Sequence, residues 1–110
     1  MNKTDAVVVL TTVASTEDAY SLVRALLERR IIACGTILPA ARSLYRWHDE
    51  IADEQEIVIL IKTRESLVGE LQEAFNEMHP YEMPELLALP VTAGSRGYLD
   101  WLELETSRVE

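Results

Sequence analysis

The segment spanning residues 78–90 carries the side chains best suited to chemistry. It contains the imidazole of His79, the phenol of Tyr81, two carboxylates and two thioethers, which can bind a soft metal, a proton or a polar ligand. Pro80 and Pro84 each fix φ at about −65° and push the preceding residue towards extended geometry. A loop this stiff can position a ligand group, or it can simply connect a helix to a strand.

A lysine and several aromatic residues form a second set of candidates. Lys62 ends an aliphatic run, so its stem can lie along apolar surface with the ammonium in water. The alternative is that Lys62 anchors an anionic ligand or pairs with Glu85. Tyr45, Trp47 and Tyr81 suit interface or core packing, but beside a lysine and a glutamate they can also line a ligand cleft.

Two sulfur-containing side chains complete the candidate metal ligands. Cys34 is the only cysteine, which excludes an intrachain disulfide and a multi-cysteine zinc site. We expect it to be a buried small hydrophobe, with soft-metal binding as the alternative. Met78 ends an apolar helical stripe, so we expect core packing, although its thioether can ligate Cu(I).

Length and charge exclude several classes of function. The chain has 110 residues, which predicts one domain spanning 1–110. Its formal net charge of −9 repels a polyanion, so we expect no nucleic-acid partner. No apolar run reaches the roughly 18–20 residues that a membrane span needs. Residues 1–5 lead directly into a strand-like run without the features of a signal peptide, so we expect a cytoplasmic location.

The hydrophobic pattern predicts the elements that must position these residues. Strands are expected at 6–10, at 31–34 continuing through 43–47, at 56–63 and at 86–91. Ser15 is expected to cap a helix over 16–30, whose apolar stripe is Ala19, Leu22, Val23, Leu26 and Leu27. Thr63 is expected to cap a second helix that Pro80 stops, and Gly94 to open a short terminal helix. Tyr98, Trp101 and Leu102 are spaced to pack that last helix. The order β-α-β-β-α-β-α predicts an α+β, ferredoxin-like split βαβ fold.

The predicted hairpin around residues 48–50 is too long for so small a sheet. Both arms exceed the usual strand length of about 3–10 residues, and Pro39 is expected to mark a bend in the first arm. The arm projects Leu44, Tyr45 and Trp47, which are costly to leave in water. Pairing with the edge of a neighbouring subunit resolves this, so we expect an oligomer.

Several short segments occur in the order and spacing of a known family. They are Ala33-Cys34 with Ile37-Leu38-Pro39, Ser43-Leu44-Tyr45 with Trp47, Ile61-Lys62-Thr63, His79-Pro80-Tyr81 with Pro84-Glu85, Leu89-Pro90, and Tyr98-Leu99 with Trp101-Leu102. The chain therefore resembles CutA, the divalent-cation-tolerance proteins, from about Ala6 to Leu104. The resemblance implies a ferredoxin-like subunit, a homotrimer built by intersubunit strand pairing and an association with copper and other divalent metals. It also implies a trimer similar to the PII signalling proteins, which bind small ligands between subunits.

The metal site implied by this resemblance transfers only in part. Family members with a copper site have a cysteine where this chain has Thr11, and two adjacent histidines where it has Met78 and His79. Only His79 carries over, so we expect weak to moderate copper binding.

Three classes of function stay open. The first is a cytoplasmic trimeric divalent-metal-binding protein, and the second is a PII-like sensor that binds a small anion in an intersubunit cleft of Lys62, Tyr81, Glu85, Trp47 and Tyr45. The third is a structural trimer that docks on a partner. We expect no enzyme, because the sequence offers no nucleophile with a nearby base, no phosphate-cradling glycine loop and no complete set of metal ligands.

Overall fold

The structure is a computed structural model that describes residues 4–108, so the predicted domain of 1–110 extends beyond it at both ends. The elements in chain order are β1 (Ala6–Val13), α1 (Thr16–Glu28), β2 (Cys34–Trp47), β3 (Glu50–Arg64), a 3-10 turn (Glu65–Leu67), α2 (Val68–Met78), β4 (Leu87–Pro90) and α3 (Arg96–Glu105). This order confirms the predicted β-α-β-β-α-β-α succession.

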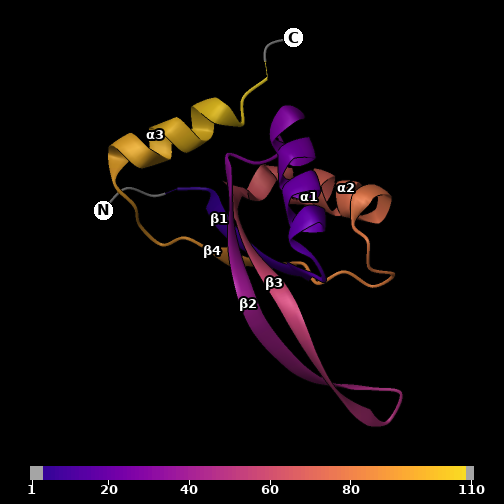
Figure 1. Ribbon diagram of the computed structural model, residues 1–110. Coiled ribbons are helices and arrows are strands. Elements are labelled where there is room, and N and C mark those ends of the chain that lie inside the picture. Colours follow the sequence, from indigo (N-terminus) through magenta and orange to yellow (C-terminus); the bar gives the residue numbers. More distant parts are fainter. Residues whose placement is uncertain (1–3, 109–110) are drawn as a thin grey trace.

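The four strands form one antiparallel sheet with the order β2-β3-β1-β4. Helices α1 and α2 lie on one face of the sheet, and α3 lies on the other side near the N-terminal end of β1 (Figure 1). This is the expected ferredoxin-like split βαβ arrangement, with the long hairpin and the C-terminal helix added to it. Among the described residues, no helix is both long and apolar enough to cross a bilayer.

The core lies between the sheet and the two helices α1 and α2. Alternate residues of β3 are buried, and the same alternation in β1 points Val9, Thr11 and Val13 at the helices. Phe75 of α2 is the largest fully buried side chain of this core. Gly35 lets α1 approach closely, because a Cβ at that position would lie 2.7 Å from Val23.

A small second cluster fixes α3 to the opposite face. Leu102 is buried there with Ala6 and Ala33, and Leu99 packs against them. Tyr98 and Trp101, which were expected to pack on the same side of α3 as Leu102, contact each other, with ring centroids 5.4 Å apart. Leu102 is buried, whereas both rings remain substantially exposed.

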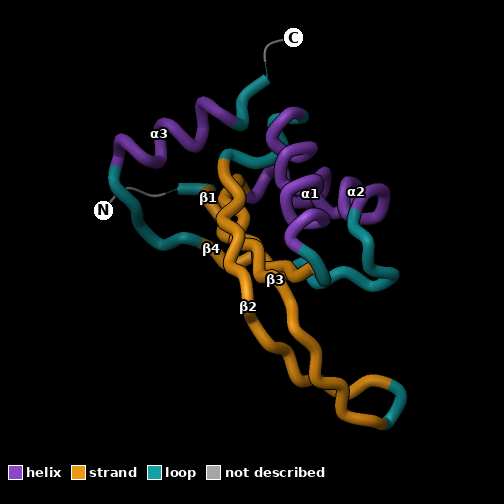
Figure 2. Tube along the Cα trace, in the orientation of Figure 1, coloured by secondary structure: helices purple, strands orange, loops and turns teal. Residues whose placement is uncertain are grey.

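The β2–β3 hairpin runs far beyond the other strands (Figure 2). The pairing register shifts between Leu38 and Ala41, and Ala40 has a positive φ of 63°, so the bend predicted at Pro39 is present as a bulge. Two further positive-φ residues, His48 and Asp49, close the hairpin in the polar turn expected there. Leu44 and Ile51 on its outer part are 66% and 69% exposed.

Two expectations about element ends are wrong. Residues 31–33 are buried but lie outside β2, which begins at Cys34, because Arg30 turns the chain with a φ of 57°. Thr63 does not cap α2, since it lies within β3 and its hydroxyl donates to the Ile31 carbonyl over 2.6 Å. The Ser15 cap is confirmed, because its hydroxyl accepts the Asp18 N–H over 3.1 Å.

Candidate functional site

His79 occupies the end of α2, where the helix gives way to the proline-containing loop. Its backbone N–H donates to the Phe75 carbonyl over 2.9 Å, and its own backbone is extended, with φ −71° and ψ 135°. This is the conformation that Pro80 favours in the residue before it. The side chain is only 8% exposed and lies between the rings of Phe75 and Tyr81, with both centroids 5.2 Å away.

Both ring nitrogens of His79 have hydrogen-bond partners. Nδ1 accepts the Tyr81 backbone N–H over 3.1 Å. The proton of the neutral ring therefore sits on Nε2, which lies 3.1 Å from Thr11 Oγ1 and donates to it. A neutral histidine that ligates a metal through one nitrogen needs its proton on the other, so either nitrogen can bind a metal only if the Tyr81 backbone or the Thr11 hydroxyl moves.

The surroundings keep this imidazole neutral. Burial lowers the pKa of His79 below its usual value of 6.5, and the Thr12 backbone and the Asp18 charge oppose this only in part. Protonation of Nδ1 would also place the new Nδ1–H against the backbone N–H of Tyr81, so that two donors face each other and the hydrogen bond is lost. The ring is thus in the protonation state that metal binding requires at neutral pH.

A buried carboxylate lies next to this loop. The Tyr81 hydroxyl donates to Glu56 Oε2 over 2.7 Å, and Glu56 is 7% exposed. Burial acts to raise the pKa of Glu56. Hydrogen bonds from the Ser43, Tyr81 and Thr12 side chains together lower it by more, so the pKa of Glu56 lies below its usual value. Burial and the bond to Glu56 raise the pKa of Tyr81. The sequence analysis did not identify Glu56 as a site residue. Its position directly before the apolar run of β3 was a signal that this carboxylate could be buried.

Glu85 lies close enough to Glu56 for the two carboxyl groups to affect each other. Burial, together with the Glu56 charge, raises the pKa of Glu85. Tyr45, another predicted cleft residue, donates through its hydroxyl to Glu54 over 3.0 Å. The loop after α2 and the middle of the hairpin therefore form one region, in which tyrosines bond to acidic side chains.

Lys62 and Cys34 lie on the face of the sheet that points away from α1 and α2. Lys62 Nζ is 2.5 Å from Thr36 Oγ1 and 3.7 Å from Cys34 Sγ. Gly35, between Cys34 and Thr36, faces α1, so its two neighbours face away from the helices. Cys34 is only partly buried, which corrects the expectation of a buried hydrophobe.

The predicted ligand cleft does not form within one chain. Lys62 and Glu56 are six residues apart along β3, which corresponds to a distance of about 20 Å at the rise of a strand. Glu85 lies near Glu56 and is therefore also far from Lys62. Trp47 pairs with Glu50 at the hairpin end, twelve residues or about 40 Å from Lys62. A cleft that joins these residues needs more than one subunit and stays a prediction.

The three predicted metal ligands are also not brought together. Met78 packs against the main core, as expected, while His79 and Cys34 belong to opposite faces of the sheet. Within residues 4–108, no three His, Cys, Asp or Glu side chains are arranged so that they could hold a metal ion.

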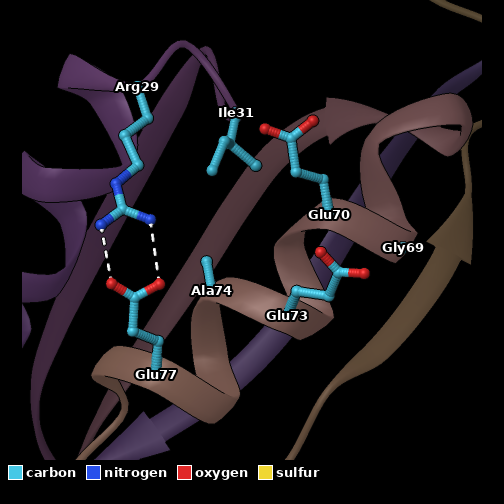
Figure 3. Close-up of a pocket in the computed structure, with 7 residues that line it drawn as sticks. All are labelled: Arg29, Ile31, Gly69, Glu70, Glu73, Ala74 and Glu77. Atoms are coloured by element: carbon cyan, nitrogen blue, oxygen red, sulfur yellow. Dashed lines mark hydrogen bonds and ion pairs between the residues drawn. The ribbon is translucent and has the colours of Figure 1, made fainter.

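A separate surface cavity of about 610 Å³ lies between the end of α1 and α2. The Arg29 guanidinium points at the Glu77 carboxylate and bonds both of its oxygens, at 3.1 and 3.4 Å (Figure 3). Glu70, which also lines the cavity, pairs with Arg108. These exposed ion pairs join the helices and the C-terminal segment but contribute little stability individually.

Comparison with known proteins decides the family. The family model described as "CutA1 divalent ion tolerance protein" matches residues 7–105. The chain belongs to the CutA family. The divalent-cation tolerance protein CutA of Thermus thermophilus is 44% identical over 99 residues, which cover 90% of this chain and 96% of the relative.

Solved CutA structures also agree with the fold. The T. thermophilus structure has a TM-score of 0.90 at 43% identity, covering 93% of this chain and 99% of that one. CutA of Synechococcus elongatus has a TM-score of 0.92 at 36% identity, covering 97% and 95%. The role of this CutA chain at the level of the family is therefore divalent-cation tolerance.

We predict that Tyr81→Phe destabilises this CutA protein. The change removes a hydrogen bond to a buried carboxylate, so the free energy of unfolding at pH 7 should fall by about 1.5–3 kcal/mol. Urea denaturation measures this. Tyr20→Phe, at an exposed position on α1, is the matched control, and an equal effect of the two changes would show that the Glu56 bond is unimportant.

Proposed function

We propose that this CutA protein acts in the cytoplasm as a homotrimer that binds divalent metal ions, copper among them, and so contributes to divalent-cation tolerance. We further propose that the role is one of binding rather than catalysis. The observation that carries the metal proposal is the 3.1 Å contact between Thr11 and His79.

That contact joins residues 68 positions apart, at the end of β1 and the end of α2. These are two of the positions where the family resemblance implies a cysteine and a histidine as copper ligands. The third position, Met78, directly precedes His79 in the chain. The contact between Thr11 and His79 therefore supports a metal site at this place, with a hydroxyl oxygen in the position of one of the stronger ligands.

The trimer proposal is supported by the hairpin. Leu44, Trp47 and Ile51 are all at least half exposed on strands that extend past the sheet. Burying a side chain of this kind against a neighbour contributes about 1.5–3 kcal/mol. Intersubunit pairing along the hairpin would thus turn an exposed apolar surface into a stabilising one.

We predict weak to moderate copper binding that depends on His79. Isothermal calorimetry should show Cu(II) preferred over Mg(II) and Ca(II), which favour oxygen ligands, and His79→Ala should abolish the copper signal. Affinity should fall with pH only below the usual histidine range, because the pKa of His79 is lowered and a neutral ring persists there. Unchanged affinity in His79→Ala would contradict the assignment.

A gain-of-function variant provides the complementary arm. Thr11→Cys with Met78→His places a thiolate beside the His79 ring and a second imidazole at the residue before it, so copper affinity should rise by at least about tenfold, the equivalent of 1.4 kcal/mol. Cys34→Ser in both backgrounds removes the other thiol and should leave the gain intact. If the double variant binds copper no better than the parent, these positions do not form a metal site.

A further inference from the structure

The hydrogen bonds of the His79 ring set a condition on any metal that binds it. Nδ1 is an acceptor, because it takes the Tyr81 backbone N–H over 3.1 Å. A neutral imidazole that ligates a metal uses one nitrogen for the metal and carries its proton on the other. Nδ1 is then either metal-bound or protonated, and in neither case can it accept a hydrogen bond. Metal binding through His79 therefore breaks the bond from Tyr81, whichever nitrogen is the ligand.

The surroundings of the ring decide which part of the molecule must move. His79 is buried, and its ring contacts those of Phe75 and Tyr81. Phe75 in α2 and Thr11 in β1 are both fully buried in the main body of the protein. Tyr81, by contrast, is only partly buried and lies on the loop between α2 and β4. The ring is therefore uncovered by a movement of this loop.

Tyr81 is held at both of its ends. Its backbone N–H donates to His79, and its hydroxyl donates over 2.7 Å to Oε2 of the buried Glu56 in β3. A hydrogen bond to a buried charged group is among the stronger ones in a protein, and it weakens once the donor and acceptor separate beyond about 3.2 Å. A movement of Tyr81 that releases Nδ1 also pulls its hydroxyl away from Glu56. The Glu56 bond therefore opposes the opening of the loop.

We propose that Tyr81 is a positioning residue that latches the loop after α2 over His79, so that metal binding and the bond from Tyr81 to Glu56 oppose each other. This inference rests on the proposed metal-binding function and adds the regulation of the same site. Only molecules with an open loop bind the metal, so the apparent affinity is the intrinsic affinity multiplied by the open fraction. By linkage, a bound metal loosens the latch by the same factor by which a loosened latch raises the affinity.

Calorimetric titration of the full-length protein with Cu(II), in its native oligomeric state, tests the affinity. Tyr81→Phe keeps the ring but removes the bond to Glu56, so copper affinity should rise about tenfold although the variant is less stable. His79→Ala in the Tyr81→Phe background should remove this gain. Tyr20→Phe removes a phenol hydroxyl from an exposed position on α1 and should leave copper affinity unchanged. Glu56→Gln keeps an acceptor without the charge, so its gain should be smaller than that of Tyr81→Phe.

Hydrogen exchange of the Tyr81 amide provides a readout that a merely structural role would not move. Pro80 has no N–H, so exchange at residues 80–81 reports on Tyr81 alone. A ligand that binds the native state ordinarily slows exchange by stabilising that state. Copper should instead speed exchange at Tyr81 by about tenfold or more, because the amide loses its acceptor, while exchange within β3 does not become faster. Mass spectrometry of the protein with and without copper measures both.

The results distinguish a failure of the latch from a failure of the metal site. Absence of copper binding, or unchanged binding in His79→Ala, refutes the proposed function and the latch with it. Copper binding that depends on His79 but leaves exchange at Tyr81 unchanged refutes the latch alone. Equal copper affinities of the parent and Tyr81→Phe, both folded by circular dichroism, refute it as well. If Tyr81→Phe misfolds, Glu56→Gln and the exchange of the parent protein decide the matter.

Discussion

A variant that carries Leu44→Asp and Ile51→Asp is expected to be a monomer at micromolar concentration. Both side chains project from the same face of the hairpin, since Leu44 pairs with Asp53 and Ile51 with Arg46, and these two pairs are two residues apart along the strands. Each substitution removes apolar area from the proposed interface and would bury a carboxylate without a partner. Light scattering measures the change directly.

The control for this prediction is Tyr20→Asp, which adds a negative charge at an exposed apolar position on α1, away from the hairpin. This variant should keep the oligomeric state of the parent. A trimer that survives the double substitution would place the interface elsewhere, and a monomeric parent would refute the proposed assembly itself.

Phe75→Ala is expected to cause the largest loss of folding stability. The ring is 1% exposed in the main core and contacts the imidazole of His79, so its removal leaves a cavity behind the candidate site. The free energy of unfolding should fall by about 3–5 kcal/mol. Urea denaturation at one fixed protein concentration measures this, because assembly would make stability depend on concentration.

Two companion variants define the mechanism of that loss. Phe75→Leu keeps most of the side-chain volume, so it should lower the free energy of unfolding clearly less than Phe75→Ala does. Tyr20→Ala, on the exposed side of α1, should change the free energy of unfolding by no more than about 0.5 kcal/mol. A loss in Phe75→Ala no larger than that of Tyr20→Ala would show that the core does not depend on this ring.

Periodicity determined most of the fold because it reflects burial directly. The stripe of α1 predicts the inward residues Ala19, Leu22, Val23 and Leu26, and all four are buried. Leu27 was assigned to the same stripe but is 41% exposed, since the sheet contacts only a narrow part of the helix. Periodicity did not determine the ends of the elements. Ile31 and Ile32 are buried although they precede β2, so their apolar character does not show whether their backbone belongs to a strand.

The candidate site illustrates a different limit. The sequence predicted that Pro80 holds His79 in an extended conformation, since a proline restricts its neighbour locally. Through the family resemblance, the sequence also marked the positions of Thr11 and His79 as those of two copper ligands, of which only the histidine is retained. The hydrogen bonds that fix the ring and the pKa of Glu56, however, depend on which side chains face each other across strands.

By itself, the sequence determined the element order, the split βαβ fold and the family, because these follow from local patterns of apolar residues, prolines and short motifs. Only the tertiary structure separated Lys62 from Glu85 and joined Thr11 to His79 and Tyr81 to Glu56. The physical reason is that strand register and the alternation of faces set these distances. Two residues of one strand can therefore lie about 20 Å apart, while residues 68 positions apart in the chain share a hydrogen bond.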